Sequence, residues 1–513
     1  MNVTLTNRFS VVEYLTKKYQ LIVFGIYLLL MVMVVNKHEP WMDEAQAWLL
    51  AKDVSVKDLL VKYLRYEGSP GLWHLILMIP AKLGLPYFTI NIVSVIFSAV
   101  GVWLFLRYAP FPILIKILYP FSFFVFYQYG VVARSYCLIS PILFLLAINY
   151  DKKMDRPYFF VFLLCLLSNI SAHTFLIAGS IAFIHVTDII KEWKTLTVKT
   201  KKNQAIALSV LAIMACIVVY IIMTPPDQLF ANHVNLDFVN FCRTAQKMIG
   251  GAMVISEFNP IWVFSTASLI VFVITMHWLG QNKLALLYAL PLLLLCTLFA
   301  IKYKNFWHQG VLFLLWIFVL WISFEKYKNE PLQGFAKVVI GCIGVVLTVQ
   351  CFWSFESVSY DLENNYSGSY SLAKYIKRNK LEKEKIYVSG WRNISVLPYF
   401  AKNIFYNHNN GSNHRFWNWS VNNVTSIGAT EKVIDTIECE QPDVVIFASD
   451  HIPSKYKIEL PGYKAIAFFK GYLCWKTGLL EPECYLVFRK QEEDPEDSVY
   501  SDKFTDGKNR ISP

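Results

Sequence analysis

Long apolar runs recur along most of this chain and constrain its fold more than any other feature. From Leu21 to about Ser354 they come in stretches of roughly 15 to 22 residues, each ended by charge, Pro or Asn. Such runs can cross a hydrocarbon core about 30 Å thick. Hydrophobic residues make up 55% of the chain and charged residues 17%, whereas a soluble domain carries about 25% charge. The sequence therefore predicts a polytopic α-helical membrane protein.

About eleven transmembrane helices follow from these runs. The run over about 71–85 is not counted, because its roughly fourteen residues are more typical of a helix lying along the membrane surface. Ser69-Pro70 marks the start of that helix, as an N-cap followed by a Pro in the first turn. The predicted spans are residues 21–36, 87–107, 112–131, 135–150, 157–172, 174–190, 204–224, 260–280, 284–301, 306–324 and 334–354.

Basic residues orient these spans. The net charge is +11, and much of the excess lies in short loops, where it fixes topology and meets lipid head groups rather than nucleic acid. With the N-terminus inside, the Lys191–Lys202 cluster is cytoplasmic; counting 71–85 as a span would reverse this. No small-residue cleavage site follows Leu21–Val35, which we interpret as a retained first helix. The prediction is a multi-pass protein of the cytoplasmic (inner) membrane with a cytoplasmic N-terminus.

This topology leaves two long loops outside, at about 37–86 and 225–259, within a transmembrane module over 1–355. The first loop would hold two interfacial helices. Beyond residue 355 the sequence becomes more polar. We expect residues 356–490 to form a soluble, extracytoplasmic α/β domain and the acidic, then polar residues 491–513 to be disordered.

Short β-type runs in this tail, Ile386–Ser389 and Val444–Phe447, are the main reason to expect a sheet. The ten cysteines show neither CxxC nor Cys/His metal spacing. Cys474 and Cys484 could form a disulfide if the domain is extracytoplasmic.

The first outer loop carries the acidic residues that could do chemistry. Asp43 can cap a short interfacial helix, with Glu44 beside it; the apolar face of that helix is formed by Trp41, Ala45, Trp48 and Leu49. His38 precedes this segment, Glu67 and His74 follow it, and all three are candidate substrate-binding residues. Two carboxylates with nearby Glu and His can supply a general base and, if needed, a cation site. An Asp-Glu pair at a helix start can equally serve only as a cap with favourable dipole placement.

Cationic groups gather on the same predicted face. Arg134 stands at the outer junction of two apolar spans, where an arginine is costly unless it is paired or binds an anion. A lipid-phosphate contact, a carboxylate pair and a substrate phosphate all fit. Lys302, Lys304 and His308 form a further outside cluster, either an anion site or a solvated loop. His173, at the outer end of its span, could join the site or be structural.

The chain resembles the GT-C superfamily of membrane glycosyltransferases, closest to the bacterial branch of protein mannosyltransferases and lipid A aminoarabinose transferases. Trp41-Met-Asp43-Glu44-Ala-Gln-Ala-Trp48 is similar to the acidic motif of their first outer loop. Glu67-Gly-Ser-Pro-Gly-Leu-Trp73 is similar to the Gly-His-Pro-Pro-Leu-Trp start of their second interfacial helix, and Ala133-Arg134-Ser-Tyr136 to their Glu-Ala-Arg-x-Tyr segment. The match covers roughly the first 150 residues; beyond these only the topology agrees.

The resemblance implies a transferase that moves a sugar from a polyprenyl phosphate to an envelope glycan, lipid or protein on the outer face. Asp43 would deprotonate the acceptor with Glu44 beside it, and Arg134 with the lysines would hold the donor phosphate. Ser69 stands where relatives often have His, and Val132 where they often have Glu. The second acidic element near Arg134 is therefore missing, and no metal or other cofactor is assigned.

Two other classes of function stay open at this stage. A transporter or flippase of lipid-linked sugars would place its ionisable residues near the bilayer midplane and often shows internal repeats, neither of which is seen here. A non-catalytic envelope assembly protein would use the soluble domain as its binding module and would tolerate changes at Asp43 and Arg134.

Overall fold

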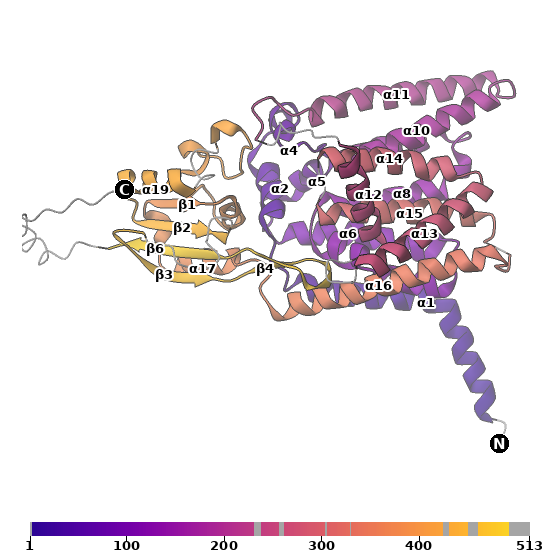
Figure 1. Cartoon of the computed structure of the whole chain (residues 1–513), viewed down its shortest axis with the longest axis horizontal. Coiled ribbons are helices and arrows are strands. Elements are labelled where there is room, and N and C mark those ends of the chain that lie inside the picture. The colour runs from indigo at the N-terminus through magenta and orange to yellow at the C-terminus, as the bar shows by residue number, and fades with distance from the viewer. Residues whose placement is uncertain are drawn as a thin grey trace, which may run out of the picture.

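A computed structural model describes residues 3–229, 237–255, 261–302, 305–328, 330–423, 430–449 and 460–491. Figure 1 shows two parts: a large bundle of helices, and a smaller domain with a sheet at one end of it. The bundle is formed by the apolar runs, and the domain by the more polar C-terminal residues. The prediction of a mostly helical protein with a small C-terminal domain that contains a sheet is thus confirmed. The predicted tail 491–513 lies almost wholly outside the described residues.

Seven helices among the described residues are long and apolar enough to cross a membrane. These helices extend over 18 to 29 residues, which is long enough to cross a hydrocarbon core. They are Lys18–Val35 of α1 (Val3–Val35), α6 (Thr89–Tyr108), the broken helix Ile113–Val131, α10 (Ala172–Glu192), α11 (Val198–Ile222), Phe306–Glu325 with α15 (Gln309–Glu325), and α16 (Phe335–Glu363). The broken helix comprises α7 (Ile113–Leu118), η2 (Tyr119–Phe121) and η3 (Phe124–Val131).

Shorter apolar helices account for the rest of the predicted spans. They are α5 (Leu72–Lys82), Ser135–Ile148 with η4 (Ser135–Leu138) and α8 (Ile139–Ile148), α9 (Pro157–Ser168), α13 (Ile261–Gln281) and α14 (Ala285–Ile301). Of these, α5 is the run that we did not count as a span. The figure of about eleven spans therefore stays a prediction.

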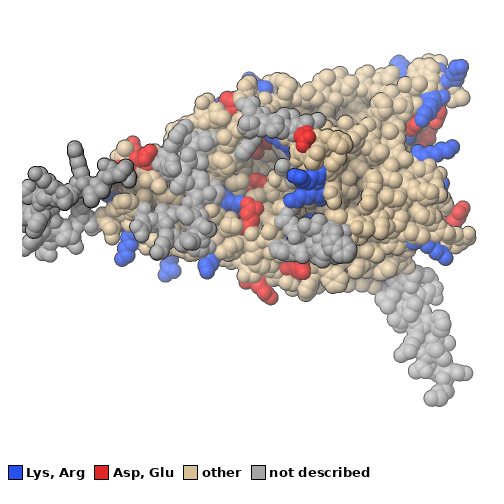
Figure 2. All heavy atoms as spheres, in the orientation of Figure 1, with Lys and Arg blue, Asp and Glu red and all other residues tan. Residues whose placement is uncertain are grey.

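Charge is distributed unevenly along the bundle. Figure 2 shows Lys and Arg, with a few acidic residues, at the end of the bundle farthest from the C-terminal domain; a second group of charged residues lies on the part nearest that domain, and the surface between the two is almost free of charge. The turn between α10 and α11, with its basic residues, lies at that far end (Figure 1). This separation suits a membrane protein with one basic end.

The first outer loop differs from prediction in how its helix starts. Helix α2 (Met42–Asp53) has Trp41, not Asp43, at its N-cap, and Glu44 reaches back to the Trp41 N–H. Asp43 therefore lies inside the first turn, and its predicted role as cap is wrong. The predicted apolar face is buried, but the helix does not lie on a surface, because it packs between α5 and η8 (Trp391–Tyr399) of the C-terminal domain.

Short helices complete the loop: α3 (Val56–Asp58), η1 (Leu59–Tyr63) and α4 (Leu64–Glu67), which ends at Gly68 in a left-handed conformation. Within the predicted loop 225–259 the structure has a further helix, α12 (Phe238–Met253), which packs on α14 and α15. The Asp237 side chain caps it by accepting from the Asn240 N–H. This amphipathic helix was not predicted.

The C-terminal domain begins after α16, which continues to Glu363 rather than ending near residue 354. Its sheet has the order β1-β2-β6-β3, with β1 and β2 parallel and the other pairs antiparallel. The strands are β1 (Ile386–Ser389), β2 (Val444–Ala448), β3 (Tyr463–Phe469) and β6 (Tyr485–Lys490), with a separate pair β4 (Tyr472–Cys474) and β5 (Leu480–Pro482). Around it lie α17 (Ser369–Arg378), η7 (Leu381–Lys383), η8, η9 (His408–Gly411), α19 (Thr430–Glu440) and η11 (Lys476–Gly478). Both predicted strand runs are confirmed as β1 and β2.

The predicted Cys474–Cys484 disulfide is wrong, since all ten cysteines are free thiols. The register of β4 on β5 explains this. Cys474 faces Leu480 in that pair, whereas Cys484 lies beyond the last paired residue, Pro482. The Cys484 thiol donates instead to the Gly471 carbonyl, 3.3 Å away.

The C-terminal domain is fastened to the bundle by buried polar contacts. The Lys476 ammonium, on η11, donates to the carbonyls of Gly251 and Ile255 at 2.8 Å each and to the Gln309 side chain at 2.6 Å. Arg415 forms an ion pair with Asp53 at the end of α2. Because each of these buried charges has partners, the bundle and the C-terminal domain can pack closely without leaving any of them unpaired.

Candidate active site

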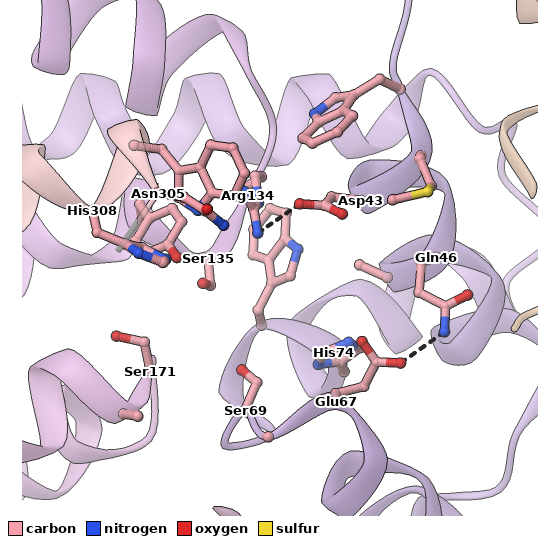
Figure 3. A pocket seen from close by; sticks show the side chains of 18 of the residues that line it. Asp43, Gln46, Glu67, Ser69, His74, Arg134, Ser135, Ser171, Asn305 and His308 are labelled. Carbon is pink, nitrogen blue, oxygen red and sulfur yellow. Dashed lines mark hydrogen bonds and ion pairs between the residues drawn. The ribbon is translucent and has the colours of Figure 1, made fainter. Parts of the chain in front are cut away.

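A cavity of about 420 Å³ lies where the bundle meets the C-terminal domain, and we call it the Asp43 cavity. Its walls come from α2, the α4–α5 turn, the segments that begin η4, α10 and α15, and the C-terminal domain. Figure 3 shows Asp43 and Arg134 pointing toward one another, with Asn305 and His308 to one side and Glu67 and His74 to the other. The apolar sequences of the helices position these polar groups at helix ends, outside the longest apolar stretches.

Asp43 and Arg134 form an ion pair, with Arg134 Nη2 2.9 Å from Asp43 Oδ2. The guanidinium lies among three aromatic rings, at 4.9 Å from Trp307, 5.3 Å from Tyr136 and 5.9 Å from Trp41. Such rings fix the plane of an arginine and stabilise its charge. Among the residues that the structure describes, none forms a hydrogen bond with the buried Arg134 Nη1. It is therefore a donor held in place without an acceptor.

Burial raises the pKa of the Asp43 carboxyl, and Arg134 and Arg392 oppose that rise. Burial and the two arginines thus shift the pKa of this carboxyl in opposite directions. A carboxylate that is partly desolvated is a stronger base than one in water. Asp43 thus has the basicity and the cavity position that a general base needs.

Glu44, predicted to act beside Asp43, does not line the cavity. It is fully buried, and its two oxygens accept from the backbone N–H groups of Ala133 at 2.6 Å and Trp41 at 2.9 Å. These bonds tie the segment before Arg134 to the start of α2. Glu44 therefore holds the two halves of the site together rather than facing a substrate.

His38 is likewise buried away from the cavity. Its Nδ1 lies 2.7 Å from Asp361 Oδ2, near the end of α16, and its Nε2 lies 3.5 Å from Glu44. Burial lowers the pKa of His38, but Asp361 and Glu44 outweigh burial and raise it to about 10. A protonated His38 places one positive charge beside both buried carboxylates, which lowers the cost of burying them. The predicted substrate contact of His38 is not made in this cavity.

Glu67 does line the cavity and joins it to the C-terminal domain. It accepts from Gln46 Nε2 at 2.7 Å. The Gln46 amide also donates to the Trp417 carbonyl at 2.7 Å and accepts from the Trp417 N–H at 2.8 Å. Burial raises the pKa of Glu67 to about 7. Glu67 can therefore gain or lose a proton near neutral pH.

Three histidines contribute to the wall. The rings of His173 and His308 lie 4.2 Å apart between centroids, and His74 lines the cavity with its Nδ1 buried and unpaired. His173 stands in the first turn of α10, which Ser171 caps by accepting from the Thr174 N–H at 3.2 Å. Lys302 does not line the cavity, and Lys304 lies outside the described residues.

The C-terminal domain supplies site residues that the sequence did not suggest. Arg392 lines the cavity, pairs with Glu481 and lies 2.9 Å from Glu483. Trp391 and Trp419 line it as well. No local signal marks these residues, because each becomes part of the site only when the domain packs on α2.

The cavity thus combines two arginines with three carboxylates, those of Asp43, Glu67 and Glu481. Its rings are those of Trp41, Trp73, Tyr136, Trp307, Trp391 and Trp419. Such a lining suits a hydroxylated ring that carries an anionic group. Within the described ranges, no group of three or more His, Cys, Asp or Glu is placed to hold a metal ion.

Comparisons of the chain with known protein families, with curated proteins and with solved structures found no match.

Proposed function

We propose that the protein is an integral-membrane glycosyltransferase that moves a sugar from a polyprenyl phosphate to an envelope glycan, lipid or protein on the outer face of the membrane. The observation that carries the proposal is the pairing of Asp43 with Arg134, whose second nitrogen is buried without a partner. One group can take a proton and the other can bind an anion, and both face one cavity.

The chemistry follows from these two groups. Asp43 takes the proton of the acceptor hydroxyl, and the acceptor oxygen forms a bond to the anomeric carbon of the sugar. The bond between that carbon and the phosphate oxygen breaks, and its electron pair leaves with the polyprenyl phosphate. Arg134 Nη1, which is buried without a partner among the described residues, would donate to this phosphate as its charge grows.

An apolar groove beside the cavity supports a lipid-linked donor. Its volume is about 380 Å³, and it lies between α5, α9 and α11. Gly71 and Leu72 line this groove, while Ser69 and Trp73, on either side of them in the sequence, line the Asp43 cavity. An isoprenoid chain in the groove would bring its phosphate toward the polar groups next to it.

The polar groups also bear on the rival classes of function. They lie at helix ends next to the C-terminal domain, whereas a transporter keeps its ionisable residues near the middle of the membrane. An assembly protein needs no paired acid and arginine in a cavity. The position and pairing of Asp43 and Arg134 therefore favour transfer.

The test is a reconstituted reaction. The full chain in proteoliposomes receives a radiolabelled polyprenyl-phosphate sugar and an envelope extract, and the products are identified by mass spectrometry. Asp43→Asn should lower transfer by about 10²–10⁴-fold, the usual contribution of a general base. Asp58→Asn, in an exposed turn of the same loop, is the matched control and should have no effect.

The outcomes separate the classes. Full transfer by well-folded Asp43→Asn protein would show that Asp43 is not the base. Movement of the labelled lipid across the bilayer without a new glycosylated product would instead identify a flippase. No transfer and no movement with any envelope extract would leave the assembly role.

A further inference from the structure

A second cavity, of about 580 Å³, lies beside the first, and we call it the Glu39 cavity. It is lined by residues 36–40, by the start of α6, and by the end of α16 with the chain that leads into the C-terminal domain. Tyr370 and Tyr399 of that domain complete it. No residue lines both cavities: Pro40 lines this one and Trp41 the other.

The floor of the Glu39 cavity holds buried oxygens that lack partners. Asp361 and Tyr87 are 1% and 7% exposed, and Asp361 Oδ1 and the Tyr87 hydroxyl make no hydrogen bond within the described part of the chain. Glu39 Oε2 is a third such atom. Buried polar atoms in folded proteins are nearly always bonded, so three unpaired oxygens around one cavity indicate a ligand with several hydrogen-bonding groups.

Two hydrogen bonds hold the Asp361 side chain in place. Asp361 Oδ2 is already bound by His38 Nδ1 at 2.7 Å and by the Tyr127 hydroxyl at 3.1 Å. The Asp361 side chain therefore cannot rotate without breaking both contacts. A fixed acceptor of this kind favours a ligand of matching shape.

Aromatic rings and amides form the rest of the wall. Tyr399 packs 5.5 Å from Tyr87 and 5.3 Å from Tyr370, measured between ring centroids. Tyr370 and Phe88 are 40% and 39% exposed at the rim. An exposed ring beside hydrogen-bonding groups suits a ligand with one apolar C–H face and polar edges, which is the character of a sugar ring.

The charged groups of the wall also favour a neutral ligand with hydroxyl groups. The carboxyls of Glu39, Asp361 and Glu363 are opposed by Lys37, by protonated His38 and by Lys374, whose ammonium lies 4.1 Å from the centroid of the Tyr370 ring and favours the ionised form of Glu39. Burial raises the pKa of Glu39 to about 7, so near neutral pH this group can both donate and accept. Because the charges of the two signs nearly balance, the wall favours neither an anion nor a cation, whereas a neutral ligand with hydroxyl groups meets both donors and acceptors.

We propose that the Glu39 cavity is a carbohydrate-binding site, separate from the cavity of Asp43 and Arg134. A sugar ring would stack on Tyr370 at the rim and place its hydroxyl groups against Glu39, Asp361 and Tyr87 on the floor. This inference goes beyond the proposed function, because it concerns binding at a place where no transfer step is assigned.

Saturation-transfer difference NMR on the purified full chain tests the proposal without any transfer reaction. Maltotriose and chitotriose are the probes, with choline as a cationic comparison. We expect a signal from at least one oligosaccharide. Tyr370→Ala and Glu39→Gln should each weaken its binding about tenfold, the loss of roughly one aromatic or hydrogen-bond contact.

Two matched variants locate the binding. Tyr406→Ala removes another tyrosine of the same domain, 56% exposed and outside both cavities, and should leave binding unchanged. Trp419→Ala alters only the Asp43 cavity and should also leave it unchanged. Sugar binding that survives Tyr370→Ala and Glu39→Gln, a response to choline alone, or no response to either oligosaccharide would overturn the assignment. None of these results depends on whether the protein transfers sugars.

Discussion

The carboxylate of Glu44 accepts a 2.6 Å hydrogen bond from the backbone N–H of Ala133, the residue before Arg134. Its other oxygen accepts from the N–H of Trp41, two residues before Asp43. One buried side chain thus sets the relative position of the two residues that meet in the cavity. Catalysis by such a pair depends on its geometry, and displacement by about 1 Å can cost about 10²-fold in rate.

The first prediction concerns this bridge. Glutamine has a single carbonyl oxygen, so Glu44→Gln can keep only one of the two backbone bonds and turns an amide N–H toward the other donor. We expect transfer to fall about 10²-fold. The pH optimum of the bell-shaped pH–rate profile should stay the same, because Asp43, the proposed base, is not changed. Glu438→Gln, an exposed acid of α19, is the control. A profile displaced along the pH axis would indicate that Glu44 itself titrates in the reaction.

Arg134→Lys tests the anion-binding role of the free nitrogen. Lysine can keep the charge opposite Asp43 but presents no second, fixed donor. We expect the KM for the polyprenyl-phosphate donor to rise about tenfold with a smaller change in kcat, equivalent to one charge-assisted hydrogen bond. Arg156→Lys, at an exposed turn, is the matched control. An unchanged KM together with a low kcat would instead assign Arg134 to orienting Asp43.

The raised pKa of Glu67 predicts that the stability of the folded protein depends on pH. Burial raises its pKa from 4.5 to about 7, so the folded protein holds this proton more tightly than the unfolded chain. Stability attributable to Glu67 is therefore highest below pH 4.5, declines as the pH rises to about 7, and is constant above that. Glu67→Gln should match the wild type near pH 4.5 and exceed it at pH 8, by no more than about 3 kcal/mol.

Thermal unfolding followed by tryptophan fluorescence at the two pH values measures this difference. Equal destabilisation by Glu67→Gln at both pH values would contradict it, since that result would mean that the wild-type carboxyl is ionised and stabilising throughout. Glu438→Gln again provides the control, as an exposed carboxyl with no role in the cavity.

His38→Ala should destabilise the fold strongly. It removes the positive charge between Glu44 and Asp361 and leaves two buried carboxylates without a counterion. Breaking a buried ion pair in this way costs about 3–5 kcal/mol. His277→Ala, an exposed histidine of α13, should change the melting temperature little. A melting temperature equal to that of the wild type would mean that the carboxyls are neutral without His38.

Much of the fold could be predicted because the signals are local. Apolar runs as long as a bilayer is thick predict helices wherever they occur, and the β-branched runs before Ser389 and Ala448 predict strands in the same way. The Asp43 and Arg134 motifs stand at the ends of such elements, so their placement on one face follows from the order of the helices. Their contact at 2.9 Å agrees with that expectation.

Only the tertiary structure decided which acids face the cavity and which support it. Glu44 is one residue from Asp43 in sequence, but on a helix adjacent side chains point in different directions, and the packing of Ala133 selected Glu44 as the bridge. Arg392 and Glu481 joined the site because the C-terminal domain docks on α2, through contacts such as Arg415 with Asp53. Periodicity along the chain specifies helices and strands; contacts between residues hundreds of positions apart depend on how those elements pack, which no local pattern records.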